Sequence, residues 1–239
     1  PPGITFEELS SCELIFICVP TPMEQNGKCH LNIVESIINR LNMIINKEYT
    51  SIVVRSTVLP GTCNRLGCHF MPEFLTEKNY INDFIECSDW IFGLLGDSKK
   101  DENFKESITK LFQYAYDEQK IKHNQLHFCM NNEAEMSKYF RNCYLATKVS
   151  FCNEMEEFCR NKNINYDVVR ELSIKDNRIG SSHTMVPGHD GKRGFGGTCF
   201  PKDTSALLYE MNEIGMKSYV LTSIVNRNIE VDRIEKDWN

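Results

Sequence analysis

A glycine-rich stretch around one cysteine is the part of this sequence best suited to covalent chemistry. Residues 194–203 read Gly-Phe-Gly-Gly-Thr-Cys-Phe-Pro-Lys-Asp, and the cysteine is Cys199. Glycines let a backbone approach a ligand closely, and Pro201 suits the first residue of a helix. A thiol at a helix N-terminus beside Lys202 favours the thiolate, so Cys199 is a candidate nucleophile. The alternative is a structural thiol, because free cysteines are among the most often buried residues.

Four other polar residues have positions that suit acid–base or oxyanion chemistry. Lys138 and Asn142 are four residues apart in a predicted helix, so they would share one face and could meet one substrate. Asp203 is four residues after Cys199 and could reach toward the thiol, but an aspartate as third helical residue is also ordinary capping chemistry. Glu73 lies at a predicted strand end, where α/β enzymes often place catalytic groups. Each of the four is also compatible with a surface role.

The elements that must position these residues follow from the apolar pattern. Short apolar runs bounded by turn residues predict strands at residues 14–19, 51–57, 68–71, 90–95 and 126–130. Apolar spacing predicts helices at residues 33–46, 101–116, 167–172, 202–213 and 220–233. Residues 133–160 contain neither Gly nor Pro and predict one long helix. The expected fold class is α/β: a partial Rossmann-like parallel sheet in residues 1–130, then an all-helical central domain in residues 131–239.

Composition excludes several classes of function. The formal charge of −6 and the pI near 5.6 argue against nucleic acid or an anionic membrane as a partner, and no apolar run reaches the ~20 residues of a membrane helix. The eleven cysteines include no CxxC pair, which favours reduced thiols and a cytoplasmic protein. His123 and His127 have the spacing of a helical metal pair, but residues 125–130 look like a strand, so no metal is expected.

Several spaced motifs, taken in order, resemble the UDP-glucose dehydrogenase (nucleotide-sugar dehydrogenase) family through nearly the whole chain. Those that carry the resemblance are residues 16–22, 56–62, 71–77, 135–142 with 153–154, 176–180, 187–188 and 194–203. The resemblance implies a double oxidation of the primary alcohol at carbon 6 of a UDP-sugar, UDP-glucose to UDP-glucuronate, with two NAD⁺.

The resemblance also implies a role for each candidate catalytic residue. A water held by Lys138 and Asp203 would remove the hydroxyl proton. Cys199 would then form a thiohemiacetal and later a thioester. Lys138 and Asn142 would stabilise the oxyanion, and Glu73 would activate the hydrolytic water.

By the same resemblance, two further sets of residues would bind the cofactor and the sugar nucleotide. The cofactor set is Val19, Pro20, Thr21, Thr57, Glu77 and Lys202. The substrate set is Phe74, Leu75, Arg178, Phe195, Gly196 and Gly197. Arg178 would reach across a homodimer built on the long helix at residues 133–160, and the loop at residues 186–194 would close over the sugar.

Two parts of the family pattern do not occur in the sequence, namely the G-x-G-x-x-G turn that holds a cofactor pyrophosphate and the C-terminal domain that helps bind UDP. We therefore expect the dehydrogenase to be a longer protein, and these 239 residues alone to bind NAD weakly. Two alternatives stay open: a single-step β-hydroxyacid-type dehydrogenase, and a non-catalytic dimeric scaffold. Which UDP-sugar is used also stays open.

Overall fold

Strands and helices alternate in the first part of the chain, and helices follow. The structure, a computed structural model, describes residues 5, 6, 8–76 and 78–238. Its elements are η1 (Glu8–Ser11), β1 (Leu14–Ile17), α1 (Asn32–Leu41), β2 (Ser51–Val54), α2 (Thr62–Leu66), β3 (His69–Phe70), α3 (Tyr80–Ile85), β4 (Asp89–Leu94), α4 (Ser98–Asp117), β5 (Gln125–Met130), α5 (Asn131–Asn161), α6 (Tyr166–Ser173), α7 (Phe200–Glu213), α8 (Tyr219–Arg227) and η2 (Asn228–Asp232).

The chain divides into two compact units. The first comprises Pro1–Pro22 and Cys29–Lys138, and the second comprises Met23–Lys28 and Tyr139–Asn239. The division falls inside α5, between Lys138 and Tyr139. The domain boundary predicted between residues 130 and 131 stays a prediction; it falls at the junction of β5 and α5, eight residues before this division.

One five-stranded sheet organises the first unit, in the order β1-β2-β3-β4-β5. β1, β2 and β3 pair in parallel, with α1 and α2 as the crossovers that parallel neighbours need. β4 pairs antiparallel with β3, Phe70 lying opposite Gly93, and β5 runs parallel to β4. The prediction of a largely parallel sheet is confirmed. The antiparallel step was not predicted, because the path of the segment between β3 and β4 has no directional signal in the sequence.

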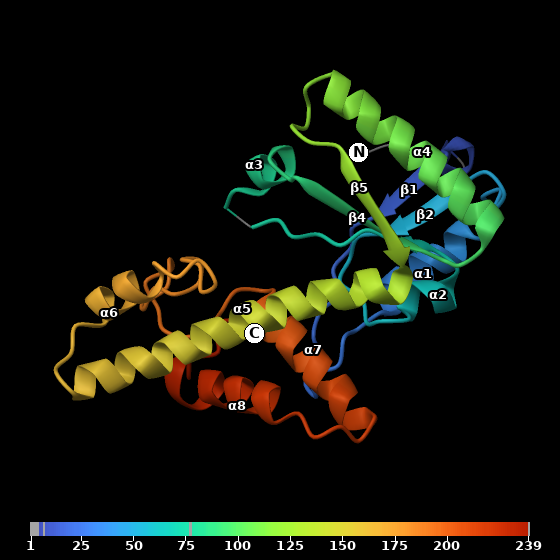
Figure 1. Cartoon of the computed structure of the whole chain (residues 1–239). Helices are drawn as coiled ribbons and strands as arrows, with labels where there is room; N and C mark the ends of the chain where they lie inside the picture. Colours follow the sequence, from blue (N-terminus) through green and yellow to red (C-terminus); the bar gives the residue numbers. More distant parts are fainter. Residues whose placement is uncertain (1–4, 7, 77, 239) are drawn as a thin grey trace. The chain divides into compact units, whose positions relative to one another are not determined.

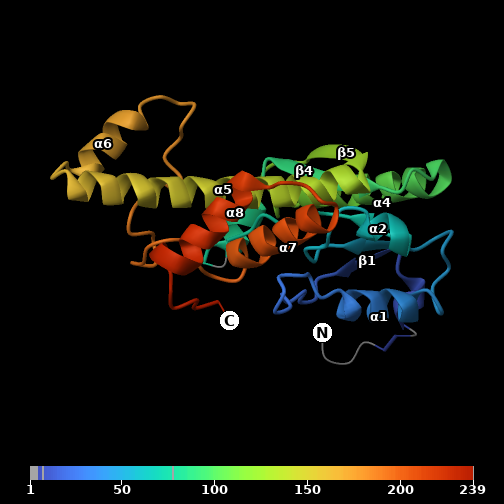
Figure 2. The same ribbon diagram turned by 90° about the horizontal axis from the view of Figure 1, so that it is seen from below.

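Alternation along the strands builds a core on each face of the sheet. Ile52 and Val54 of β2 pack in a cluster with Ile38 of α1, whereas Val53 belongs to a second cluster with Phe104 of α4. Successive strand residues point to opposite faces, so one short apolar run can serve both clusters. Figure 1 and Figure 2 show α4 on one side of the sheet and α1 on the other. This buried strand pattern is the reason that sequence reasoning located all five strands.

The long helix is present as predicted, with 31 residues. Within the second unit α7 and α8 lie beside α5, as Figure 2 shows, and Ser150 Oγ of α5 donates to the Ile224 carbonyl of α8 at 3.4 Å. Cys152, Cys159 and Tyr166 form a small buried cluster where α5 meets α6. The helical character expected for this part of the chain is confirmed, although residues 174–199 form a long loop.

Two helix predictions need correction, and two short helices were not predicted. The helix expected at residues 33–46 ends at Leu41, and turns follow it. The helix expected to reach residue 233 ends at Arg227 and continues as the π-helical turn η2. The short helices α2 and α3 were missed, since five or six residues provide too little periodicity.

No helix in the described part of the chain is long and apolar enough to cross a membrane. Each of the eleven cysteines is a free thiol.

Candidate active site

The loops after β1 and β2 are tied together at the carboxyl edge of the parallel strands. The backbone N–H of Val19 donates to Ser56 Oγ at 2.9 Å, and this hydroxyl donates to the Val19 carbonyl at 2.7 Å. Of the other predicted cofactor residues, Thr21 is buried, Thr57 is half-buried and Pro20 is exposed. Ligands of open α/β sheets bind beyond this edge of the strands. Glu77, also predicted to bind cofactor, lies outside the described residues.

A buried carboxylate that sequence reasoning did not single out for a role supports the second of these loops. Glu135 of α5 accepts the N–H groups of Gly61 at 2.5 Å and Cys63 at 2.8 Å, at the start of α2. An anion at a helix N-terminus satisfies donors that have no partner within the helix. Burial raises the pKa of Glu135, while these two hydrogen bonds lower it. The contact joins residues more than 70 positions apart, so no local signal could reveal it.

Lys138 and Glu73 meet in the first unit. The buried ammonium of Lys138 donates to the Glu73 carbonyl at 2.9 Å. Phe74 and Leu75, the next two residues, are half-buried. Burial raises the pKa of Cys18, which follows β1, while Arg55 lowers it and Glu73 raises it further. Glu73 therefore lies near the carboxyl ends of β1 and β2.

In the second unit, Asp203 joins two of the predicted residues. Its carboxylate accepts Asn142 Nδ2 at 2.6 Å and Lys202 Nζ at 2.7 Å, and the aspartate is fully buried. The thiol of Cys143 contacts the Asp203 carbonyl at 3.9 Å, and burial raises the pKa of this thiol to about 12. The cluster therefore combines a carboxylate, an ammonium and an amide whose orientation is set by a charge-assisted hydrogen bond.

Cys199 is exposed and lies at the N-cap of α7. Its Sγ is 3.8 Å from Thr198 Oγ1, and its carbonyl accepts the Asp203 N–H at 2.9 Å, the first turn of the helix. The helix begins at Phe200, two residues before the predicted range of residues 202–213. Pro201 is the second helical residue rather than the first, and Asp203 is the fourth rather than the third. The Asp203 carboxylate consequently contacts Asn142 and Lys202 instead of capping the helix.

Three predicted substrate residues lie in the glycine-rich loop before Cys199. Phe195 is buried, Gly196 is half-buried, and Gly197 is exposed with a positive φ of 69°. Sequence reasoning missed the side chains that hold this loop, above all Asn228 and Arg233. Polar residues near the end of a predicted helix are usually solvated, so only the fold reveals their contacts.

The basic residues around the loop at residues 186–194 are engaged in ion pairs within the unit. Lys192 pairs with Asp237 at 2.5 Å and with Glu235 at 3.3 Å. Arg193 pairs with Glu156 of α5. Arg178, predicted to reach a substrate, is 90% exposed and pairs with Asp176 at 2.5 Å.

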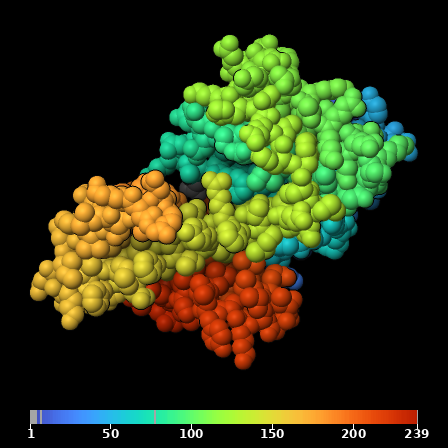
Figure 3. Space-filling view, viewed as in Figure 1, coloured from blue at the N-terminus to red at the C-terminus, as the bar shows by residue number. Residues whose placement is uncertain are grey.

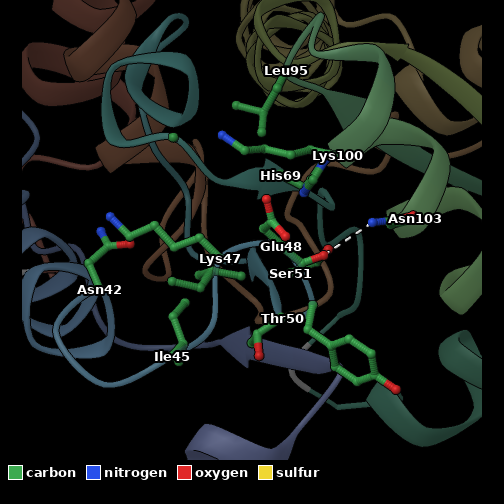
Figure 4. Close-up of a pocket in the computed structure, with 13 residues that line it drawn as sticks. Asn42, Ile45, Lys47, Glu48, Thr50, Ser51, His69, Leu95, Lys100 and Asn103 are labelled. Carbon is green, nitrogen blue, oxygen red and sulfur yellow. Dashed lines mark hydrogen bonds between the residues drawn. The ribbon is translucent and has the colours of Figure 1, made fainter.

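A small recess of about 40 Å³ lies in the first unit, away from all the predicted site residues. Figure 4 shows it between the segment after α1 and the N-terminus of α4, where Asn103 Nδ2 donates to the Glu48 carbonyl at 3.1 Å. Ser51 and His69, which begin β2 and β3, line it, so the recess lies at the sheet edge opposite Val19 and Thr57. In the described residues no group of three or more His, Cys, Asp or Glu side chains could hold a metal ion.

The structure thus brings the predicted residues together in two groups, each within one unit. Lys138 and Glu73 form the first group, and Asn142, Lys202 and Asp203 form the second. Lys202 and Asp203 lie in the first turn of α7, whose N-cap is Cys199, and Asn142 reaches Asp203 from α5.

Comparisons with known proteins agree over both units. Residues 4–116 match the NAD binding domain of the UDP-glucose/GDP-mannose dehydrogenase family, and residues 132–230 match the central domain of that family. UDP-glucose 6-dehydrogenase from Rickettsia bellii is 31% identical over an alignment of 237 residues, which covers 94% of this chain and 51% of that protein. GDP-mannose 6-dehydrogenase from Pseudomonas savastanoi pv. phaseolicola is 28% identical over 93% of this chain and 52% of its own length.

A solved UDP-glucose dehydrogenase from the hyperthermophilic archaeon Pyrobaculum islandicum superposes with a TM-score of 0.77 at 26% identity. The match covers 94% of this chain and 52% of that one. The chain spans about half the length of the curated relatives it matches.

Proposed function

Because this chain belongs to the UDP-glucose/GDP-mannose dehydrogenase family, we propose that the protein oxidises the primary alcohol of a UDP-sugar to a carboxylate. UDP-glucose, converted to UDP-glucuronate, is the first candidate substrate. The observation that carries the proposal is the polar cluster at the N-terminus of α7. There, Cys199 is exposed at the helix N-cap, and Asp203 orients Asn142 and Lys202 one turn away.

NAD is the cofactor named by the domain that residues 4–116 match. The tied loops after β1 and β2 fit such a group, because their backbone is held at the edge of the sheet where ligands bind. Val19, Pro20, Thr21 and Thr57 would hold the cofactor, with Glu77 and Lys202 assigned to it by the family resemblance. When bound, NAD⁺ would accept a hydride in each of the two oxidations, first from the alcohol and then, as a second NAD⁺, from the thiohemiacetal that becomes the thioester.

The proposed chemistry of the chain's own residues is nucleophilic. The thiolate of Cys199 attacks the aldehyde carbon, a C–S bond forms, and the carbonyl oxygen becomes an oxyanion. The amide of Asn142 and the ammonium of Lys138 stabilise this oxyanion. Asp203 orients Asn142 and, with Lys138, holds the water that takes the hydroxyl proton in the first oxidation. Glu73 activates the water that hydrolyses the thioester.

The sugar nucleotide would contact two segments. Phe74 and Leu75 follow Glu73 in the first unit, and the loop of Phe195, Gly196 and Gly197 precedes Cys199 in the second. Arg178 would serve a second copy of the protein across a dimer. Its exposed side chain is compatible with that role.

We further propose a homodimer formed through α5. An aromatic stripe, each residue 56–68% exposed, recurs along α5 at helical spacing, and it consists of Phe140, Tyr144, Phe151 and Phe158. The first two rings are parallel, with centroids 6.5 Å apart. Figure 3 shows part of the surface of α5 uncovered between α6 and the two helices α7 and α8. Four exposed aromatic rings on one helix face suit a protein partner.

The free thiols support a reducing compartment such as the cytoplasm.

The first prediction concerns Cys199. In the full-length protein, Cys199→Ser is expected to lower formation of the uronate from UDP-glucose and NAD⁺ at least 100-fold, because a neutral hydroxyl is a far weaker nucleophile than a thiolate. Cys18→Ser, which changes the other exposed thiol, is the control and should retain activity.

The measurement is the number of NADH molecules formed per UDP-glucose consumed. Two NADH molecules per UDP-glucose would support the double oxidation, and one would indicate a single-step dehydrogenase. A folded protein that forms no NADH would indicate a scaffold. Full conversion to the uronate by Cys199→Ser would remove the proposed role of this residue.

A further inference from the structure

Two side chains beyond α8 hold the loop that leads to Cys199. We propose that Asn228 and Arg233 are positioning residues, which fix the backbone of residues 194–196 so that Cys199 is presented at the start of α7. The proposal rests on the proposed function in that it takes Cys199 as the nucleophile. Both side chains are polar yet almost fully buried, with 1% and 3% exposure. Buried polar groups are paired, and their partners therefore show what they hold.

Asn228 clamps one residue of the loop through both of its main-chain groups. Its Oδ1 accepts the Phe195 N–H at 2.8 Å, and its Nδ2 donates to the Phe195 carbonyl at 2.9 Å. The preceding residue, Gly194, has a φ of 66°, and a Cβ there would lie 2.4 Å from Asn228 Oδ1. A second asparagine, Asn153 of α5, accepts the Gly194 N–H at 3.1 Å. The clamp therefore needs glycine at 194 and defines the peptide planes on both sides of Phe195.

Arg233 supports the next residue of the loop. A Cβ on Gly196 would lie 2.5 Å from the guanidinium carbon, so the bare backbone of this glycine packs directly against Arg233. The guanidinium donates to the Arg193 carbonyl at 3.2 Å, and it pairs with Asp190 at 2.5 Å and with Asp237 at 2.8 Å. Carboxylates on both sides prevent the guanidinium from moving away, which makes it a rigid surface for the loop.

The π-helical turn η2 places the two side chains together. The Arg233 N–H donates to the Asn228 carbonyl at 2.7 Å, which closes a five-residue turn instead of the usual four. Single π-type turns at the end of α-helices are rare and occur often at functional sites. In this chain the turn brings Asn228 and Arg233 to the same loop, one at Phe195 and the other at Gly196.

The position of Cys199 follows from this anchoring. Only Gly197 and Thr198 separate the held segment from Cys199, and the Cys199 carbonyl is already fixed by the Asp203 N–H. The ring of Phe195 also contacts that of Phe200 edge to face, with centroids 6.4 Å apart. Loss of the clamp would free the loop on one side of Cys199 while α7 stays intact on the other. A nucleophile displaced by even ~1 Å loses a large part of its rate.

Asn228→Ala, Asn228→Asp and the control Asn226→Ala, all in the full-length protein, test the proposal. Asp has the shape of Asn and keeps the acceptor for the Phe195 N–H, but it cannot donate to the Phe195 carbonyl. Asn226 lies exposed near the end of α8, two residues before Asn228. With UDP-glucose and NAD⁺ as probes, we expect Asn228→Ala to lower kcat at least 10-fold while KM for NAD⁺ changes less than 2-fold. The decrease in log kcat for Asn228→Asp should be about half of the decrease for Asn228→Ala, and Asn226→Ala should retain kcat.

A second readout needs no substrate. Iodoacetamide labels exposed thiols, and peptide mass spectrometry gives the labelling rate of Cys199 relative to Cys18, an exposed thiol in the other unit. We expect this ratio to change at least 3-fold in Asn228→Ala, because the released loop no longer holds the Cys199 thiol in one position at the start of α7. If Asn228→Ala does not fold, Asn228→Asp decides the question by the same two measurements.

A folded Asn228 variant with unchanged kcat and an unchanged labelling ratio would overturn the proposal. Full activity in Cys199→Ser would instead overturn the proposed role of Cys199 as the nucleophile, and the labelling ratio would still report whether Asn228 holds the loop.

Arg233 is tested through its contact with Gly196. Gly196→Ala should lower kcat because its methyl group meets the guanidinium, and Arg233→Ala should lower kcat because the loop loses its support. The fold decrease in kcat of the double variant should be at least 3-fold smaller than the product of the fold decreases of the two single variants, since removal of Arg233 makes room for the methyl group. If the fold decrease in kcat of the double variant equals the product of the two single decreases, a direct role of this contact is contradicted.

Discussion

At the scale of single residues, the two candidate acids have very different surroundings. Asp203 is fully buried, and its two oxygens are taken by Asn142 and Lys202. Glu73 is half-buried, and its backbone carbonyl, rather than its carboxylate, accepts the ammonium of Lys138. Asp203 therefore orients two neighbouring side chains, whereas the activation of a water by the half-buried Glu73 side chain stays a proposal.

Asp203→Asn should destabilise the protein markedly. The substitution leaves Lys202 Nζ, on a side chain only 17% exposed, without its anionic partner. Loss of one partner of a largely buried pair costs on the order of 3 kcal/mol, and urea denaturation would measure it as a decrease in the free energy of unfolding. Asp167→Asn, an exposed aspartate in the first turn of α6, is the control and should change that free energy by less than about 0.5 kcal/mol. Equal stabilities for the two variants would contradict this view of Asp203.

At the scale of elements, the buried His69 joins β3 to the turn between β4 and α4. Its Nε2 is 3.0 Å from Asp101 Oδ1, and its ring stacks on Phe104 at a centroid distance of 3.9 Å. Asp101 also accepts the N–H groups of Leu95 at 2.9 Å and Gly96 at 2.8 Å, which closes the turn. The pKa of His69 is lowered, because burial and Lys100 outweigh the opposing effects of Asp101 and Asp97.

This lowered pKa predicts a loss of stability in mild acid. Below pH ~6.5 His69 is protonated in the unfolded chain but stays neutral in the folded chain. The free energy of unfolding therefore falls as the pH decreases, until the pH reaches the pKa of His69 in the folded chain. Between pH 7.5 and 5.5 we therefore expect the wild type to lose more stability than His69→Gln, by up to ~1.4 kcal/mol for each unit of lowering. Chemical denaturation at both pH values would measure the difference, with exposed His123→Gln as control. A wild type and a His69→Gln variant with the same pH dependence would refute the argument.

At the scale of the whole molecule, α5 contributes residues to both units. In the second unit it also presents the aromatic stripe that supports a dimer. Within that unit, the loop at residues 186–194 is held by acids from α5 and from the C-terminal segment, including Glu156 and Asp237.

Phe151→Glu tests the assembly. A charge in the centre of an apolar contact should raise the dissociation constant of the dimer at least 10-fold, and sedimentation over a range of concentrations would measure it. Tyr219→Glu introduces the same charge at an aromatic side chain that is 74% exposed on α8, and it should leave the dimer intact. Equal weakening by both variants, or none by either, would place the dimer contact elsewhere.

The amino-acid sequence by itself determined the local features. Apolar runs located the strands, the absence of Gly and Pro located α5, and the glycine-rich loop before Pro201 located the helix start at Cys199. These features depend on backbone preference and side-chain burial within a few residues, and both are encoded locally.

Only the tertiary structure decided where the polar side chains bind. Glu135 holds the start of α2, Asn228 and Arg233 hold the glycine-rich loop, and Asp203 contacts Asn142 instead of capping its own helix. The sequence alone does not distinguish any of these residues from a polar residue that is exposed to solvent. The physical reason is that a buried polar group is stable only with a specific partner, and these partners lie 33 to 74 residues away and meet it only in the folded chain.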